Sequence, residues 1–178
     1  MALSLENLNE DVRSNMLSEV ERDVAEGTLY ISARLNERGQ QGYLALLREA
    51  IQSHDDSWLA TNLRAQGYFN ATYIRRKPSG GYTQASMPND AHETLAEGEF
   101  NRFYIRGLCL YAMQQGVPEL EVYRAKAVAR PRWESEARIG ARVNAETLLN
   151  DVRTHPGVDT ALGLPAGPNS GLSVRIPR

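Results

Sequence analysis

The sequence predicts a mainly α-helical fold with a small β component. We expect a helical body over residues 1–155, a β-hairpin near 68–87 within it, and an extended C-terminal arm over 156–178. Three observations support this. Apolar residues recur at spacings of three and four before and after the hairpin segment. The hairpin segment itself joins β-forming residues through a turn-forming stretch. The last 23 residues hold four prolines and four glycines, which exclude a helix.

Composition fits one globular domain with a real core. The chain has 178 residues, of which 42% are hydrophobic and 24% charged. Cys109 is the single cysteine, so no intrachain disulfide can form, and its apolar neighbours predict a small buried side chain rather than a nucleophile. The first sixteen residues are polar and acidic, unlike a signal peptide, and no apolar run approaches the roughly 20 residues of a membrane span. We expect folding in a reducing cytoplasm and no membrane contact.

Charge is distributed unevenly along the chain. The first 60 residues hold five arginines against eleven acidic residues, a net of −6. The remaining residues hold fifteen basic against eleven acidic residues, a net of +4. A molecule polarised in this way could stack head to tail. The alternative is two differently decorated surfaces that only tune encounter rates.

Three helices are predicted before the hairpin. The first spans residues 5–26, with Ser4 as the N-cap and Gly27 ending it. Residues 28–35 alternate weakly and fit either a short strand or the start of another helix. Two shorter helices, over 40–53 and 55–66, are joined tightly at His54 and form a helical hairpin.

The β-hairpin is predicted from strands near 68–76 and 81–87 joined by the turn "KPSGG". Its tip carries three bases, Arg75, Arg76 and Lys77. Such a tip could contact a nucleic-acid phosphate backbone or an acidic partner. Alternatively, these are solvated charges that protect a strand edge from aggregation.

The longest helix, over residues 89–115, has apolar side chains almost all round and is therefore predicted at the centre of the core. Gly107 in its interior costs about 1 kcal/mol relative to alanine, which suggests close approach by another backbone. Arg102 and Arg106 stand four apart, and Glu99 can pair with Arg102. We interpret them as a salt-bridged stripe; the alternative is an arginine pair facing a partner subunit or a DNA channel.

A strand over 119–127 and a helix over 143–155, capped by Asn144, complete the body. Between them, residues 124–138 form a basic run that includes Arg132 and Trp133. Bases interleaved with aromatic residues can bind nucleic acid, but they also dominate protein interfaces. We favour a protein interface for this run.

Catalytic, metal and cofactor motifs are absent from the sequence. The three histidines lack metal-ligand spacing, and neither a P-loop nor a nucleophile elbow occurs. Glu97 and Glu99 are near each other, but a solvated helix end explains them better than acid–base chemistry. We therefore expect a non-enzymatic protein without a cofactor.

The C-terminal segment "GLSVRIP" alternates apolar and polar residues with the period of a strand. An extended arm of this kind can add to a neighbour's sheet. The expected anchors of the arm are Leu164, Pro165, Pro168, Asn169, Leu172, Val174 and Ile176. Alternatively, the segment folds back as an edge strand of its own domain. On the arm hypothesis, deleting residues 160–178 would abolish assembly and leave the fold intact.

Three stretches, "EGEFNRFYIRGLC", "EVYRAK" and "GLPAGPNSGLSVRIP", resemble segments of a virion structural family carried by tailed bacteriophages. The resemblance covers roughly the C-terminal half of the chain. It implies a neck component similar to the head-to-tail connectors that form rings under a portal, and hence a location in the virion. It further implies a homo-oligomeric ring that contacts the portal, other neck or tail proteins and, in passing, DNA.

Two other functions remain open at this point. One is a decoration protein on the capsid surface. The other is a nucleic-acid-binding module that uses residues 75–77 and the basic run 124–138.

Overall fold

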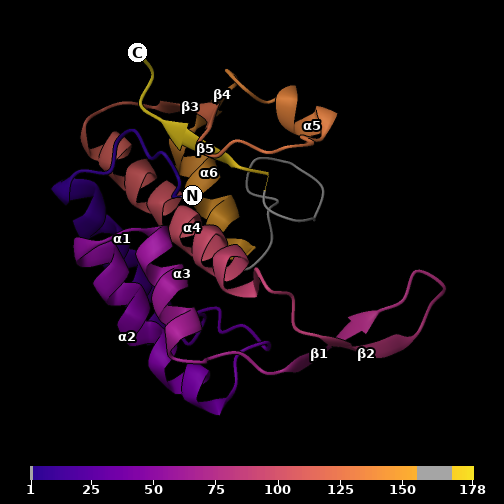
Figure 1. The fold of residues 1–178 in the computed structure, drawn as a ribbon. Helices are drawn as coiled ribbons and strands as arrows, with labels where there is room; N and C mark the ends of the chain where they lie inside the picture. Colours follow the sequence, from indigo (N-terminus) through magenta and orange to yellow (C-terminus); the bar gives the residue numbers. More distant parts are fainter. Residues whose placement is uncertain (1, 156–169) are drawn as a thin grey trace.

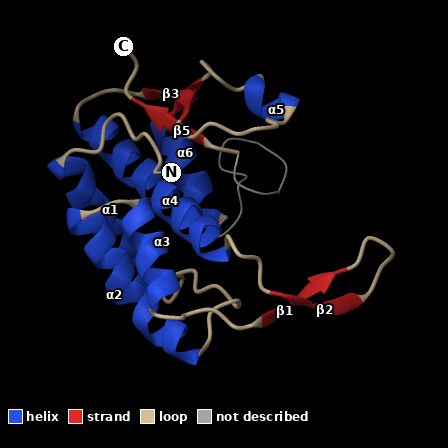
Figure 2. Ribbon diagram, viewed as in Figure 1, coloured by secondary structure: helices blue, strands red, loops and turns tan. Residues whose placement is uncertain are grey.

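The structure, a computed structural model, describes residues 2–155 and 170–178. Within these ranges six helices and two small sheets are present (Figures 1 and 2). This confirms a mainly α fold with a small β component. In chain order the elements are α1 (Glu10–Glu26), α2 (Glu37–Ser53), α3 (Asp56–Ala65), β1 (Thr72–Arg76), β2 (Tyr82–Ser86), α4 (Ala91–Gln114), β3 (Glu119–Arg124), α5 (Trp133–Glu136), β4 (Arg142–Asn144), α6 (Ala145–Thr154) and β5 (Leu172–Arg175).

Helix α4 is the centre of the core, as its apolar circumference predicts. It packs against α1, α3 and α6 and also contacts the sheet formed by β3 and β5 (Figure 1). Phe100, Phe103, Tyr104 and Leu108 on this helix are fully buried. Cys109 is buried beside them, as predicted.

The first helix is shorter than predicted and begins at Glu10. The Asn9 side chain accepts a hydrogen bond from the Val12 amide at 2.9 Å, so Asn9, and not Ser4, is the N-cap. The residues before it are held outside the helix because other groups engage their backbone. The Ser4 amide donates to the Ala125 carbonyl, and the Ser4 carbonyl accepts from the Tyr123 hydroxyl. Residues 28–35 form neither a strand nor a helix; Leu35 makes one isolated bridge with Phe69.

Gly107 lies where α1 crosses α4 closely, which confirms the predicted backbone approach. A Cβ at this position would stand 2.8 Å from the Val12 carbonyl oxygen and 3.0 Å from the Met16 amide nitrogen. These are backbone atoms of α1, so they cannot move without moving the helix. Glycine suits this position because the absence of a Cβ lets the backbones of α1 and α4 come into contact.

We expect Gly107→Ala to destabilise the fold. Alanine gains about 1 kcal/mol of helix propensity, but forcing α1 away from α4 costs about 1–3 kcal/mol, so the net effect is a loss. Urea unfolding followed by circular dichroism would measure it. Met113→Ala, at an exposed site on the same helix, is the matched control and should change stability by less than about 0.5 kcal/mol. A Gly107→Ala protein more stable than the parent would contradict the close packing.

The C-terminal segment folds back on its own domain. Strand β5 pairs antiparallel with β3, with Val122 opposite Val174 and Tyr123 opposite Ser173, in a sheet of order β4–β3–β5. Leu172 and Val174 are buried in the core of the same chain, and Ile176 packs partly against it. The prediction of a free arm docking on a neighbour is therefore wrong for residues 170–178. Strand β4 occupies one edge of β3, and β5 pairs with the other edge.

The remaining expected anchors of the arm, Leu164, Pro165, Pro168 and Asn169, lie outside the described residues. Two small elements escaped prediction. Helix α5 has only four residues, and β4 has three, both too short to show a periodicity. Asn144 caps α6 through its side chain, as predicted.

Candidate interaction surface

The β1–β2 hairpin projects from the helical body and reaches well beyond it (Figures 1 and 2). Its strands are antiparallel, with Ile74 opposite Gln84 and Arg76 opposite Tyr82. The hydrophobic core takes no residue from either strand in the described part of the chain. The hairpin is therefore not positioned by packing on the core.

One side of the hairpin is entirely exposed. Side chains alternate between two sides of a strand, so every second residue shares a side. We name this side the outer face; it consists of Thr72, Ile74, Arg76, Tyr82, Gln84 and Ser86, all exposed. Ile74 is 66% exposed and Tyr82 is 73% exposed, and these two large side chains are diagonal neighbours across the strands.

The opposite side of the hairpin contacts the body near its base. The Arg34 guanidinium stacks over the Tyr73 ring, 4.6 Å from its centroid. The Asn70 side-chain amide donates to the Leu35 carbonyl at 3.1 Å. These contacts orient the hairpin at its root and leave the outer face and the tip free.

Basic charge is concentrated at the tip. Arg75, Arg76 and Lys77 are all exposed, and no acidic residue occurs between Asp56 and Asp90 in the sequence. An isolated two-stranded hairpin is marginally stable in water, and its outer edges pair with no other strand of the described chain. An exposed apolar pair beside three bases on such an element is typical of a docking surface rather than of a structural hairpin.

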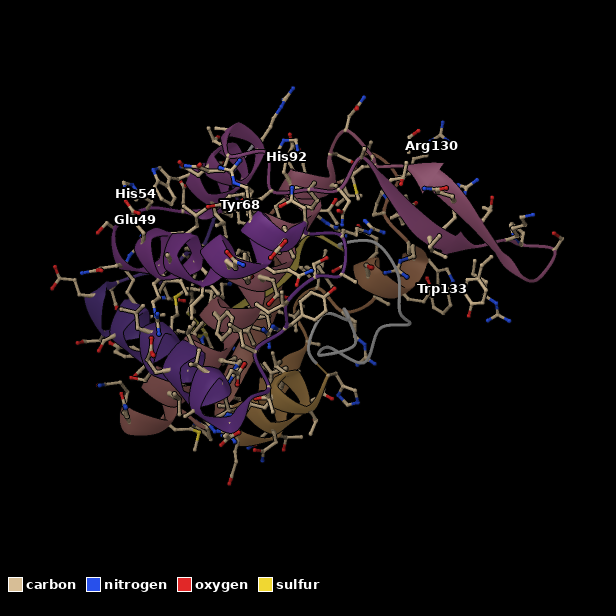
Figure 3. All side chains as sticks on the ribbon, turned by 90° about the horizontal axis from the view of Figure 1, so that it is seen from below. Glu49, His54, Tyr68, His92, Arg130 and Trp133 are labelled. Carbon is tan, nitrogen blue, oxygen red and sulfur yellow. The ribbon has the colours of Figure 1, made fainter. Side chains whose placement is uncertain are left out.

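Trp133 and Arg130 lie toward the same end of the molecule as the hairpin, whereas Glu49 and His54 lie toward the opposite end (Figure 3). Trp133 opens α5 and is 76% exposed. Arg132 precedes it and is partly buried. The structure thus leaves Trp133 accessible, and its predicted role at an interface remains a prediction.

The basic run 124–138 is less free than the sequence suggests. Arg124 pairs with Glu136 and donates to the Ser170 carbonyl, and Lys126 pairs with Glu97. These cations are neutralised within the chain. The run therefore offers fewer charges to a phosphate backbone than its composition indicates, which weakens the nucleic-acid hypothesis for this segment.

A buried ionic cluster lies where α1, α4 and α6 meet. Arg106 is fully buried; its Nε donates to Glu19 Oε2 at 2.7 Å, and its Nη1 and Nη2 donate to the two Asp23 oxygens at 2.6 and 2.7 Å. Arg153 also pairs with Glu19. Glu99 binds Arg102 at 2.6 Å, the predicted local pair.

Burial and ion pairing act on these carboxylates in opposite directions. Burial by itself would raise the pKa of Glu19 and of Asp23, but their arginine partners outweigh it, and both pKa values lie below the ordinary range. Burial dominates at Glu99 and raises its pKa despite Arg102. Arg102 and Arg106 therefore belong to an internal cluster, and the alternative of an arginine pair facing a partner or a DNA channel is wrong.

Three kinds of group bear on possible chemistry: the thiol, the neighbouring carboxylates and the metal-ligating side chains. Burial raises the pKa of the Cys109 thiol to about 12, so this side chain stays protonated at neutral pH. Glu97 and Glu99 are both buried, so the prediction of a solvated helix end is wrong; each carboxylate instead binds a basic side chain, Lys126 and Arg102 respectively. A cavity of about 840 Å³ beside the first half of α4 is lined by these same paired charges. No group of three or more metal-ligating side chains occurs among the described residues.

No family model, no curated protein and no solved structure matches the chain. Over the described residues, no helix combines the length and apolarity that crossing a membrane requires. The class that the fold defines is thus a small helical protein with a projecting hairpin.

Proposed function

We propose that this protein is a non-enzymatic structural component of a tailed-phage virion, a head-to-tail connector that assembles as a ring between portal and tail. The single observation that carries the proposal is the projecting hairpin with its exposed outer face. It takes the docking role that the sequence assigns to the C-terminal arm. The resemblance of the C-terminal half to phage virion proteins supplies the context.

The separation between a closed core and a projecting hairpin supports an assembly role. The helices and the β3 sheet form a closed core that includes both the N-terminal residues and β5. The hairpin contributes nothing to that core and exposes Ile74 and Tyr82. An element that exposes large apolar side chains and takes no part in the core is suited to binding another subunit.

Removing the hairpin tests the proposal cleanly. The Met87 amide donates to the Ala71 carbonyl at 2.9 Å, so residues 72–86 can be replaced by Asn-Gly, a two-residue turn that joins directly paired positions. We expect the shortened protein to keep its thermal unfolding transition and to lose assembly. Solution mass by light scattering, alone and with a candidate portal ring, measures this loss.

Arg138→Ser is the matched control, because it removes an exposed base outside the hairpin. It should assemble like the parent. A hairpin-deleted protein that still forms the parent's assemblies, alone and with the portal, would rule out the hairpin as the docking element.

A further inference from the structure

We propose that the hairpin of one copy docks on the corner between α2 and α3 of the next copy. The receiving surface consists of Glu49, His54, Asp55 and Trp58 and is named the α2–α3 corner. The inference rests on the proposed function and specifies its contact. It makes the interface heterologous, with two different surfaces meeting at each contact.

The α2–α3 corner complements the hairpin in charge. Glu49 is exposed and Asp55 is half-buried. The carboxyl end of α2 adds partial negative charge here, while the amino end of α3, which Asp55 caps by accepting the Trp58 amide at 2.8 Å, adds partial positive charge. Asp56 is buried next to them and accepts the Leu3 amide. Arg13 reaches this corner from α1, and its guanidinium donates to the Ala50 and Ile51 carbonyls at the end of α2. A tip with three bases and no acid is the matching surface.

The same corner also offers a partner for the apolar pair of the hairpin. The His54 and Trp58 rings stack at 4.4 Å with an interplanar angle of 5°, and both residues are half-buried. His54 is the C-cap of α2, the helix whose last turns carry Glu49. On the outer face of the hairpin, the apolar pair Ile74 and Tyr82 likewise lies beside a charged residue, Arg76. Aromatic residues and arginine are the residues that dominate interface energetics.

The two surfaces are separate, so a copy that donates its hairpin to one neighbour can receive the hairpin of another. The hairpin projects from one end of the molecule, and Glu49 and His54 lie toward the other (Figures 1 and 3). With the hairpin at one end and the α2–α3 corner at the other, each copy can bind the next through the same pair of surfaces. Such heterologous contacts close into a ring or continue as a filament. A ring is the form that a connector requires.

Two variants separate the two surfaces. The donor variant carries Arg75→Glu, Arg76→Glu and Lys77→Glu, all at exposed positions of the hairpin. The acceptor variant carries Glu49→Arg and His54→Arg, where the new guanidinium at 54 can still stack on Trp58. Arg64→Glu, an exposed charge reversal on α3, is the control. Each of the two variants should raise the dissociation constant for self-association about ten-fold or more.

Mixing the two variants is the decisive measurement. The donor variant keeps an intact α2–α3 corner, and the acceptor variant keeps an intact hairpin. One contact can therefore form between a copy of each. We expect each variant alone to sediment as a monomer and the 1:1 mixture to give a discrete two-copy species of twice the 19.8 kDa monomer mass. The parent protein should give larger assemblies that weaken with salt.

The outcomes distinguish this inference from the proposed function. If the acceptor variant assembles like the parent while the donor variant does not, the hairpin docks elsewhere and only the inference fails. If both variants assemble like the parent, or the parent stays monomeric at high concentration, the second-copy contact is wrong. Loss of binding to duplex DNA in the donor variant, with unchanged assembly, would assign the hairpin to nucleic acid instead.

Discussion

Deleting residues 170–178 is expected to unfold the protein rather than release an assembly arm. Leu172 and Val174 on β5 are buried in the core, and burying a large aliphatic side chain contributes about 1.5–3 kcal/mol each. The deletion also leaves one edge of β3 without its partner. A domain has about 5–15 kcal/mol of stability in total, so this loss consumes much of it.

The deletion removes a second set of contacts at the N-terminus. The Ile176 amide donates to Asn7 Oδ1 at 2.9 Å, and Arg175 binds both Glu6 and Glu121. These bonds fasten the N-terminal residues over the sheet. Without β5, the N-terminal residues lose their anchor as well.

Thermal unfolding by circular dichroism would measure the effect. We expect Tm to fall by about 10–20 °C, or the cooperative transition to disappear. Removing residues 177–178 alone is the control, since Arg178 is largely exposed, and should leave Tm within a few degrees. In the full-length chain, Val174→Asp should be as damaging as the deletion, because it buries an unpaired charge. A truncated protein that melts like the parent would show that β5 is not part of the core.

Periodicity and turn chemistry were enough to predict most of the helical body. Local features predict each of these elements: an apolar stripe or a capping side chain predicts helices α2, α3 and α4, and the turn at Gly80 and Gly81 predicts the hairpin. Alternation at Leu172 and Val174 also predicts a strand correctly. It cannot say which chain provides the neighbouring strand, because a period of two describes one strand and not its partner.

The buried ionic cluster shows again that a local sequence pattern does not identify a partner distant in the sequence. The Glu99–Arg102 pair is local and could be predicted, whereas Arg106 finds Glu19 and Asp23 across separations of 87 and 83 residues. One signal was present in the sequence. Glu19 and Asp23 stand four apart on one helix, and Arg102 and Arg106 stand four apart on another, so two matched pairs of opposite charge border apolar stripes. Such matching on two predicted helices is a reason to place them face to face.

Replacing Arg106 with methionine is expected to be among the most damaging single substitutions in the protein. Methionine fills a similar volume but leaves Glu19 and Asp23 buried beside it with part of their countercharge removed. Breaking a buried pair by removing one partner costs about 3–5 kcal/mol. Arg22→Met is the control, because its pair with Glu26 is exposed, and it should cost less than about 0.5 kcal/mol.

The pH dependence of this deficit distinguishes lost charge from lost packing. Arg106 helps hold the pKa of Glu19 and of Asp23 below their ordinary values, so in the parent this stabilisation is present at neutral pH and is lost as pH falls through the lowered pKa values. In Arg106→Met the two carboxyls take up protons more readily, which relieves the uncompensated charge. The stability gap between variant and parent, measured by urea unfolding, should therefore be widest near pH 7 and narrow below about pH 4. A gap of constant size across this range would mean that Arg106 stabilises the fold by filling space and not by balancing the acids of α1.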